Sequence, residues 1–245
     1  MIKLGIGQTI ETKSNEDGIK QASFLLERLG KNEVDIACLP EQFLPDNTIT
    51  DFEASFSQFA KIAKQYSMTI IAGAFYNKSG KELRISSPVI DNTGQFIGTQ
   101  HKIHPFDYEK DSIQPGKEVK IFSTKCKFGV VICYDMVFAD VAESMVKKGA
   151  QVLFSPARIV RRGIHPWHIY CQTRSLENRV PVLGANMQNA KFGGKSIIVD
   201  LYEDQGVMIP KTKMTVGQGI RFEEFDLKKF EKSRRIRYSD HKKFV

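Results

Sequence analysis

Three side chains that could act together on a carbonyl group follow predicted strands of the 245-residue sequence. Glu41 follows Ile-Ala-Cys-Leu-Pro, Lys102 closes the second arm of a predicted β-hairpin, and Cys133 follows Gly-Val-Val-Ile. A thiol must lose its proton before it attacks a carbonyl carbon, and a carboxylate can accept that proton. An ammonium group can stabilise the negative oxygen that then develops. These residue types therefore indicate acyl transfer through a cysteine nucleophile.

Each of the three residues also has an ordinary structural interpretation. A cysteine at the end of a buried strand usually packs as a small apolar residue. A glutamate or lysine after a strand is usually a solvated loop charge. Their shared position just beyond strand ends favours a site, because α/β folds place ligands there.

The elements that must position these residues follow an α/β pattern. Short apolar or alternating segments predict strands at 1–7, 34–39, 69–76, 86–91, 95–102, 119–123, 128–133, 151–154, 182–186, 196–200 and 219–225. Apolar residues at helical spacing predict helices from a Ser14 cap to Gly30, around 52–63, and at 138–148 and 166–178. No linker and no repeat divides the chain, so we expect one α/β domain over residues 1–245.

Composition and charge exclude several other classes of protein. The chain is 41% hydrophobic and 26% charged, as in ordinary globular domains, and its apolar runs are shorter than the roughly 20 residues of a membrane span. The formal net charge is +8, but the tail 226–245 holds eight Lys and Arg against three acids, which leaves +3 for the rest. We recognise no export signal and therefore expect a cytoplasmic protein whose four cysteines are free thiols.

Five segments, in order, resemble those of the nitrilase superfamily of carbon–nitrogen hydrolases, and specifically its amidase-type branches. Segment 35–41 is similar to the family segment of the general base, 100–104 to that of the catalytic lysine, and 130–135 to that of the nucleophile. Segments 149–156 and 174–182 are similar to two further recurring segments. The resemblance implies an α/β fold, a four-layer α-β-β-α sandwich.

The resemblance also implies roles for individual residues. Glu41 would be the general base, Lys102 the oxyanion-stabilising lysine and Cys133 the nucleophile. Glu109 would be a second active-site glutamate that positions the lysine or the substrate, and the backbone N–H of Tyr134 would complete the oxyanion hole. The implied reaction is hydrolysis of a small-molecule amide through a thioester, with no cofactor.

The sequence departs from the amidase-type pattern just after the nucleophile. Many amidase branches continue Cys-Tyr-Asp-x-Arg-Phe-Pro-Glu, whereas residues 136–140 here read Met-Val-Phe-Ala-Asp. The alternatives of an N-carbamoyl-amine hydrolase, a nitrilase or an inactive binding protein on the same fold stay open. Cys133-Tyr134-Asp135 favours an amide over a nitrile, because nitrilases carry Cys-Trp-Glu at this place.

Two other motifs could suggest a cofactor. The pairs His101/His104 and His165/His168 have zinc-like spacing, but neither has further ligands at a coherent distance in the sequence. The two glycines at 193–194 are not part of a G-x-x-x-x-G-K-[ST] motif, which a phosphate-binding loop would need. We therefore predict no metal and no nucleotide.

Three arginines, Arg158, Arg161 and Arg162, follow the predicted strand end at 154–156. A guanidinium group suits bidentate contact with a carboxylate. We expect Arg158, the nearest to the strand, to hold an anionic group of the substrate. The alternative that all three are solvated loop charges stays open.

The basic stretch 228–237, within the C-terminal arm 226–245, could bind RNA or an acidic membrane surface. Charge runs are usually solvated, and the family resemblance implies a C-terminal arm that reaches a partner subunit. We therefore predict a homo-oligomer with this arm, and neither nucleic acid nor membrane as a partner.

Overall fold

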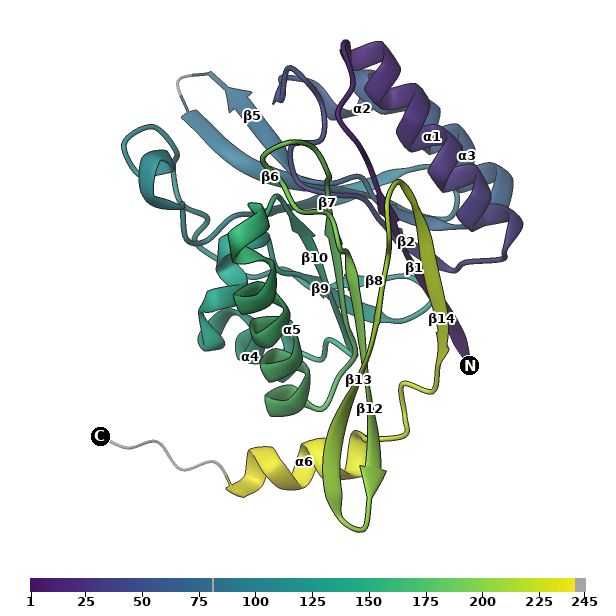
Figure 1. The fold of residues 1–245 in the computed structure, drawn as a ribbon, viewed down its shortest axis with the longest axis vertical. Helices are drawn as coiled ribbons and strands as arrows, with labels where there is room; N and C mark the ends of the chain where they lie inside the picture. Colours follow the sequence, from purple (N-terminus) through teal and green to yellow (C-terminus); the bar gives the residue numbers. More distant parts are fainter. Residues whose placement is uncertain (81, 241–245) are drawn as a thin grey trace.

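The computed structural model describes residues 1–80 and 82–240, whose strands form two packed sheets (Figure 1). In the first sheet the strands lie in the order β14 (Gly219–Phe225), β1 (Ile2–Gln8), β2 (Ile36–Cys38), β4 (Thr69–Ile71), β6 (Glu82–Ile90), β5 (Phe75–Ser79) and β3 (Thr48–Ile49), with β7 (Phe96–His101) also paired to β6. In the second sheet the order is β13 (Val207–Met214), β12 (Ile197–Asp204), β11 (Val182–Asn186), β10 (Val152–Ala157), β9 (Lys127–Val130) and β8 (Phe122–Ser123).

Helices cover the outer face of each sheet (Figure 1). The helices of the described residues are α1 (Asn15–Lys31), α2 (Phe52–Ser55), α3 (Ser57–Tyr66), α4 (Ala139–Lys147), α5 (Ile164–Asn178) and α6 (Glu231–Asp240). α1 begins as its sequence predicts, because the Ser14 hydroxyl accepts a hydrogen bond from the Asp17 N–H at 3.1 Å.

Buried apolar residues form three layers between these elements. One layer joins the two sheets and includes Leu4 of β1 and Phe154 of β10. A second layer packs the first sheet against α1 and α3 and includes Leu26. A third packs the second sheet against α4 and α5 and includes Met145. The predicted four-layer α-β-β-α sandwich is thereby confirmed.

Some predicted elements have different bounds in the structure. The helix expected around 52–63 is divided into α2 and α3 at Phe56. The strand expected at 69–76 is two strands, β4 and β5, separated at Gly73, whose φ is +98°. A Cβ at Gly73 would lie 2.3 Å from the Pro40 carbonyl oxygen, so the close approach of this backbone to the Pro40–Glu41 segment requires glycine.

The tail contains a helix that packs on its own chain. In α6, the Tyr238 hydroxyl donates to Asn178 Oδ1 and Arg237 Nε donates to the Glu177 carbonyl, both at 2.5 Å. α6 thus covers the C-terminal end of α5, while the last part of the predicted arm, 241–245, lies outside the described residues. In the part of the chain described here, no helix combines the length and apolar character that a bilayer crossing needs.

Candidate active site

Glu41, Lys102 and Cys133 converge on one cavity from the ends of three strands. Two residues separate β2 from Glu41, β7 ends immediately before Lys102, and two residues separate β9 from Cys133. Lys102 Nζ lies 3.1 Å from Glu41 Oε1, and the Glu41 carboxylate is close enough to the Cys133 thiol to raise its pKa. The structure therefore brings together the three residues that the sequence singled out for cysteine chemistry.

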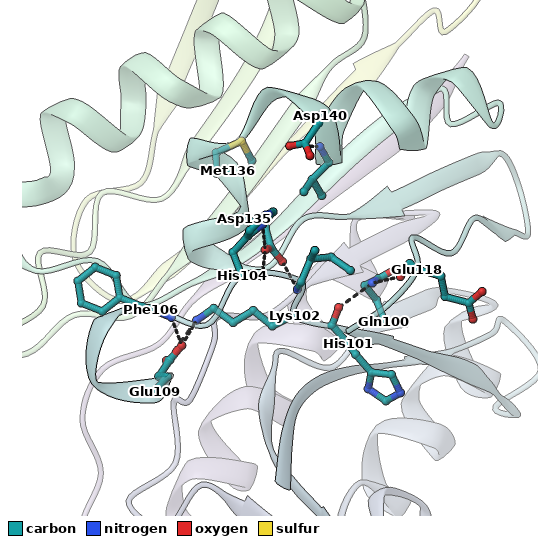
Figure 2. A network of polar contacts seen from close by, with 12 residues as sticks. Gln100, His101, Lys102, His104, Phe106, Glu109, Glu118, Asp135, Met136 and Asp140 are labelled. Carbon is teal, nitrogen blue, oxygen red and sulfur yellow. Dashed lines mark hydrogen bonds and ion pairs between the residues drawn. The ribbon is translucent and has the colours of Figure 1, made fainter. Parts of the chain in front are cut away.

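Glu109 also contacts the ammonium group of Lys102 (Figure 2). It ends the short 3-10 helix Asp107–Glu109, and its Oε2 lies 2.9 Å from Lys102 Nζ. The same oxygen accepts a hydrogen bond from the Phe106 N–H at 2.7 Å. Glu109 thus contacts both the lysine and the backbone of Phe106 in the loop that follows Lys102; its positioning role remains a prediction.

The three ion-pairing side chains are almost completely buried. Lys102 is 1% exposed, Glu41 3% and Glu109 4%. Burial alone would lower the pKa of Lys102, but the two carboxylates and Cys133 raise it above its usual value. Lys102 therefore stays a protonated ammonium group at neutral pH.

Cys133 begins a tight turn that aims its thiol at the cavity. It is the first residue of the 3-10 helix Cys133–Val137 and has a left-handed φ of +46°. Burial and the neighbouring Glu41 raise the pKa of the thiol, while Lys102 and the backbone N–H of Arg158 oppose them. The resting group is consequently a neutral thiol, and its attack on a carbonyl requires a base.

The cavity has a volume of about 410 Å³, and six aromatic side chains contribute to its wall. These are Phe106, Tyr108, Tyr134, Trp167, Tyr170 and Phe192. A cavity of this size accepts a small molecule. The predicted oxyanion residue, Tyr134, thus lies in the wall beside the thiol.

The three arginines after β10 have different surroundings. Arg158 lines the cavity, and its guanidinium lies over the Phe192 ring at 4.8 Å from the centroid. Arg162 also borders the cavity but is exposed. Arg161 donates to the Ala190 carbonyl at 2.9 Å and to a second carbonyl at 2.7 Å. Of the three, Arg158 is the best placed to meet a substrate.

Two residues of the site had not been singled out from the sequence. Gln42 is 2% exposed, lines the cavity and has a left-handed φ of +46°. Asp135 is 1% exposed and accepts backbone hydrogen bonds from Ile103 and His104. In the sequence, only their positions next to Glu41 and near Cys133 point to the site. Such proximity along the chain does not predict where a side chain points.

The histidine pairs serve other contacts. His101 Nδ1 lies 2.7 Å from the Ser86 hydroxyl, His104 Nδ1 lies 3.1 Å from Asp135, and His168 Nε2 lies 2.8 Å from a backbone carbonyl. Among the residues that the structure describes, no group of three or more His, Cys, Asp or Glu is arranged to hold a metal ion.

A four-layer α-β-β-α sandwich that gathers a carboxylate, an amine and a thiol at its strand ends defines one class of protein, the nitrilase superfamily. The family model for carbon-nitrogen hydrolases matches residues 4–216. The chain therefore belongs to the carbon–nitrogen hydrolase family, and the predicted superfamily is confirmed.

Known proteins agree with this assignment. The chain is 27% identical to the omega-amidase NIT2 of Mus musculus, over 95% of this chain and 91% of that protein. Its fold is similar to the carbon-nitrogen hydrolase from Helicobacter pylori G27, with a TM-score of 0.84, 23% identity and coverage of 98% and 94% of the two chains. It is also similar to Saccharomyces cerevisiae Nit3, a member of branch 10 of the nitrilase superfamily, with a TM-score of 0.81, 23% identity and coverage of 96% and 93%.

Proposed function

We propose that this carbon–nitrogen hydrolase is a cysteine-dependent amidase that releases ammonia or an amine and a carboxylic acid from a small-molecule amide. The observation that carries the proposal is the buried contact of Lys102 with Glu41 at 3.1 Å, beside the thiol of Cys133. A base, a nucleophile and a cation in one cavity are the groups that acyl transfer needs.

In the first half of the reaction the thiol becomes acylated. Glu41 takes the proton from Cys133 Sγ, and the sulfur forms a bond to the amide carbon. The ammonium of Lys102 and the backbone N–H of Tyr134 hold the negative oxygen of the tetrahedral intermediate. The C–N bond then breaks, the nitrogen leaves with the proton from Glu41, and a thioester remains on Cys133.

In the second half water releases the acid. Glu41 accepts a proton from a water molecule, whose oxygen attacks the thioester carbon. The C–S bond breaks, the carboxylic acid leaves, and Glu41 returns the proton to the sulfur. Glu109 holds the lysine by its 2.9 Å contact throughout, and no step needs a cofactor.

An amide is favoured over the other substrates of such a site. The mouse relative is named an omega-amidase, and the segment Cys133-Tyr134-Asp135 lacks the Trp and Glu that follow the nucleophile in nitrilases. A carbamoyl amine is the second candidate, because its carbonyl carbon also bears nitrogen and could be attacked in the same way.

We further propose that the substrate carries an anionic group bound by Arg158. The guanidinium lies in the cavity wall over Phe192, and its planar fork can donate two parallel hydrogen bonds to a carboxylate. The backbone N–H of Arg158 is directed at the Cys133 sulfur, so this residue connects the reacting centre with the wall where a substrate tail would lie.

An ammonia-release screen tests the proposed function. It would compare aliphatic amides, amides with a distal carboxylate, carbamoyl amines and nitriles, with Cys133→Ala as the blank and Cys126→Ala as the matched control. We expect amides to be hydrolysed, Cys126→Ala to stay active, and mass spectrometry after brief exposure to substrate to find the acyl group on Cys133. Activity of Cys133→Ala, or an acyl group on another cysteine, would contradict the mechanism.

A further inference from the structure

A buried carboxylate connects the turn of the nucleophile with the segment of the lysine (Figure 2). Asp135 lies two residues after Cys133, and its Oδ2 accepts a hydrogen bond from the Ile103 N–H at 3.1 Å. Its Oδ1 accepts one from the His104 N–H at 2.7 Å and lies 3.1 Å from His104 Nδ1. Ile103 is the residue after Lys102, so one side chain joins two active-site segments far apart in the sequence.

Aromatic rings make a second contact between the same two segments. The His104 ring stacks on Phe138 with centroids 3.8 Å apart and an interplanar angle of 17°. Phe106 and Tyr134 meet edge to face at 5.0 Å. Ring contacts tolerate small sliding movements, whereas hydrogen bonds weaken steeply when they are misaligned. The carboxylate of Asp135 is therefore the contact that fixes the register of the two segments.

The position of Lys102 depends on that register. The next two residues, Ile103 and His104, are the ones whose N–H groups bind Asp135. The Nζ atom of Lys102 must also reach Glu41 at 3.1 Å and Glu109 at 2.9 Å. Catalytic geometry is sensitive on this scale, since a displacement of about 1 Å can reduce a rate by ~10²-fold.

We propose that Asp135 is a positioning residue, whose carboxylate holds Lys102 at the distance from Cys133 at which its ammonium meets the oxyanion. This inference rests on the proposed function of the site. Asp135 acts through backbone N–H groups: within the described residues, its hydrogen bonds go to Ile103 and His104 and not to the side chains of the reacting groups.

The surroundings of Asp135 agree with this role. Burial raises the pKa of Asp135 to about 6, and the N–H groups of Ile103 and His104, the charge of Lys102 and the His104 side chain oppose that rise. From the helix side, Arg174 donates to the Met136 carbonyl at 3.1 Å and fixes the residue that follows the carboxylate. Hydrogen bonds thus hold both the Asp135 carboxylate and the residue that follows it. An apolar residue at position 135 could fill the same space but could not accept the bonds from Ile103 and His104.

The test compares Asp135→Asn with Asp140→Asn, an exposed acid in the first turn of α4. Asparagine keeps the size of the side chain but would direct an NH₂ group at one of the two backbone N–H groups. We expect Asp135→Asn to lower kcat by about 10- to 100-fold with KM within about threefold, and to slow the alkylation of Cys133 by iodoacetamide. Asp140→Asn should match the wild type in all three measurements.

Further variants separate positioning from mere structural support. His104→Ala keeps the backbone N–H and removes only the ring, so it should cost less than about fivefold in kcat if the backbone bonds carry the effect. If Asp135→Asn does not fold, Asp135→Glu is measured in the same way, because it keeps the charge but cannot keep the register.

The outcomes are distinct. A kcat for Asp135→Asn within threefold of the wild type, or a loss that appears only in KM, would overturn the inference. The same holds if a folded Asp135→Asn protein is alkylated at the wild-type rate. If no amide is hydrolysed by the wild type, the proposed function fails, but slower alkylation of Cys133 in Asp135→Asn than in Asp140→Asn would still support the positioning role.

Discussion

Replacing Lys102 by methionine should destabilise the fold as well as stop catalysis. Lys102 Nζ is the cation between Glu41 at 3.1 Å and Glu109 at 2.9 Å, and all three side chains are at most 4% exposed. Methionine has a similar length but no charge, so two carboxyl groups would remain buried without their cation. Removing one partner of a buried ion pair costs about 3–5 kcal/mol in the free energy of unfolding. We expect the upper end of this range, because two acids lose the same partner.

The loss should depend on pH in a defined direction. In the wild type, burial opposes the charge on Lys102 but Glu41, Cys133 and Glu109 outweigh it and raise its pKa. The stabilising contribution is therefore fully present below the unfolded pKa of lysine, ~10.4, and is lost only as the pH rises through the higher folded value. In Lys102→Met, the folded state would take up protons to relieve its buried negative charge, so its stability should fall as the pH rises.

Thermal unfolding at about pH 5.5 and about pH 8 measures both effects. For a chain of this size each kcal/mol shifts Tm by about 2–4 °C, so a loss of about 5 kcal/mol should lower the Tm of Lys102→Met by roughly 10–20 °C near pH 8 and clearly less near pH 5.5. Lys110→Met, an exposed lysine of the same loop, is the matched control and should change Tm by no more than about 2 °C. Adding Glu41→Gln to Lys102→Met should recover part of the loss. A Tm for Lys102→Met near that of the wild type at about pH 8, or an equal loss at both pH values, would refute the reasoning.

Three further predictions concern the pH profile, the substrate and the tail. Activity should fall as the pH drops below about 6, because protonation of Asp135 removes an acceptor from its backbone contacts. A plot of kcat against pH should show this acidic decrease in the wild type and lack it in Asp135→Asn. Arg158→Ala should raise KM by ~10-fold or more for a carboxylate-bearing amide and leave a neutral amide almost unaffected; equal effects on both in steady-state kinetics would remove Arg158 from the binding wall. Deleting the residues after Phe230 should reduce the mass measured by light scattering if the tail is an oligomer arm, and an unchanged mass with loss of salt-dependent RNA binding would favour nucleic-acid binding instead.

Much of the fold could be predicted because its helices and strands carry regular apolar patterns. The strands at 182–186 and 219–225 have the predicted bounds, as β11 and β14. β13 was missed, since its sequence Val-Met-Ile-Pro-Lys-Thr-Lys-Met contains a proline and no regular alternation. Such a sequence is compatible with an edge strand, where a missing N–H costs little, and β13 does lie at the edge of its sheet.

The candidate site could be predicted in its residue types but not in its geometry. Glu41 and Lys102 are 61 residues apart, and no periodicity relates them, so their contact follows from sheet packing and, at the level of sequence, only from the family resemblance. The lysine–Glu109 contact arises within one loop, which is why a short motif sufficed to indicate it. Asp135 was missed because its partners are backbone N–H groups, which every residue except proline carries and which leave no mark on the sequence.

The pairing of β1 with β14, the first and last strands of the described residues, bears on how this protein folds during its synthesis. β1 and β14 are antiparallel neighbours from Ile2 opposite Phe225 to Gln8 opposite Gly219, and β1 in turn lies beside β2, which leads to Glu41. During synthesis β1 therefore cannot pair with β14 until nearly all of the described chain has left the ribosome. Until then, the backbone N–H and C=O groups on that edge of β1 have no strand partner. Contacts between such distant segments slow folding, and an open strand edge invites pairing with other chains. A chain stopped before residue 219 should accordingly accumulate as aggregate, and newly made protein should depend on chaperones that shield this edge until β14 arrives.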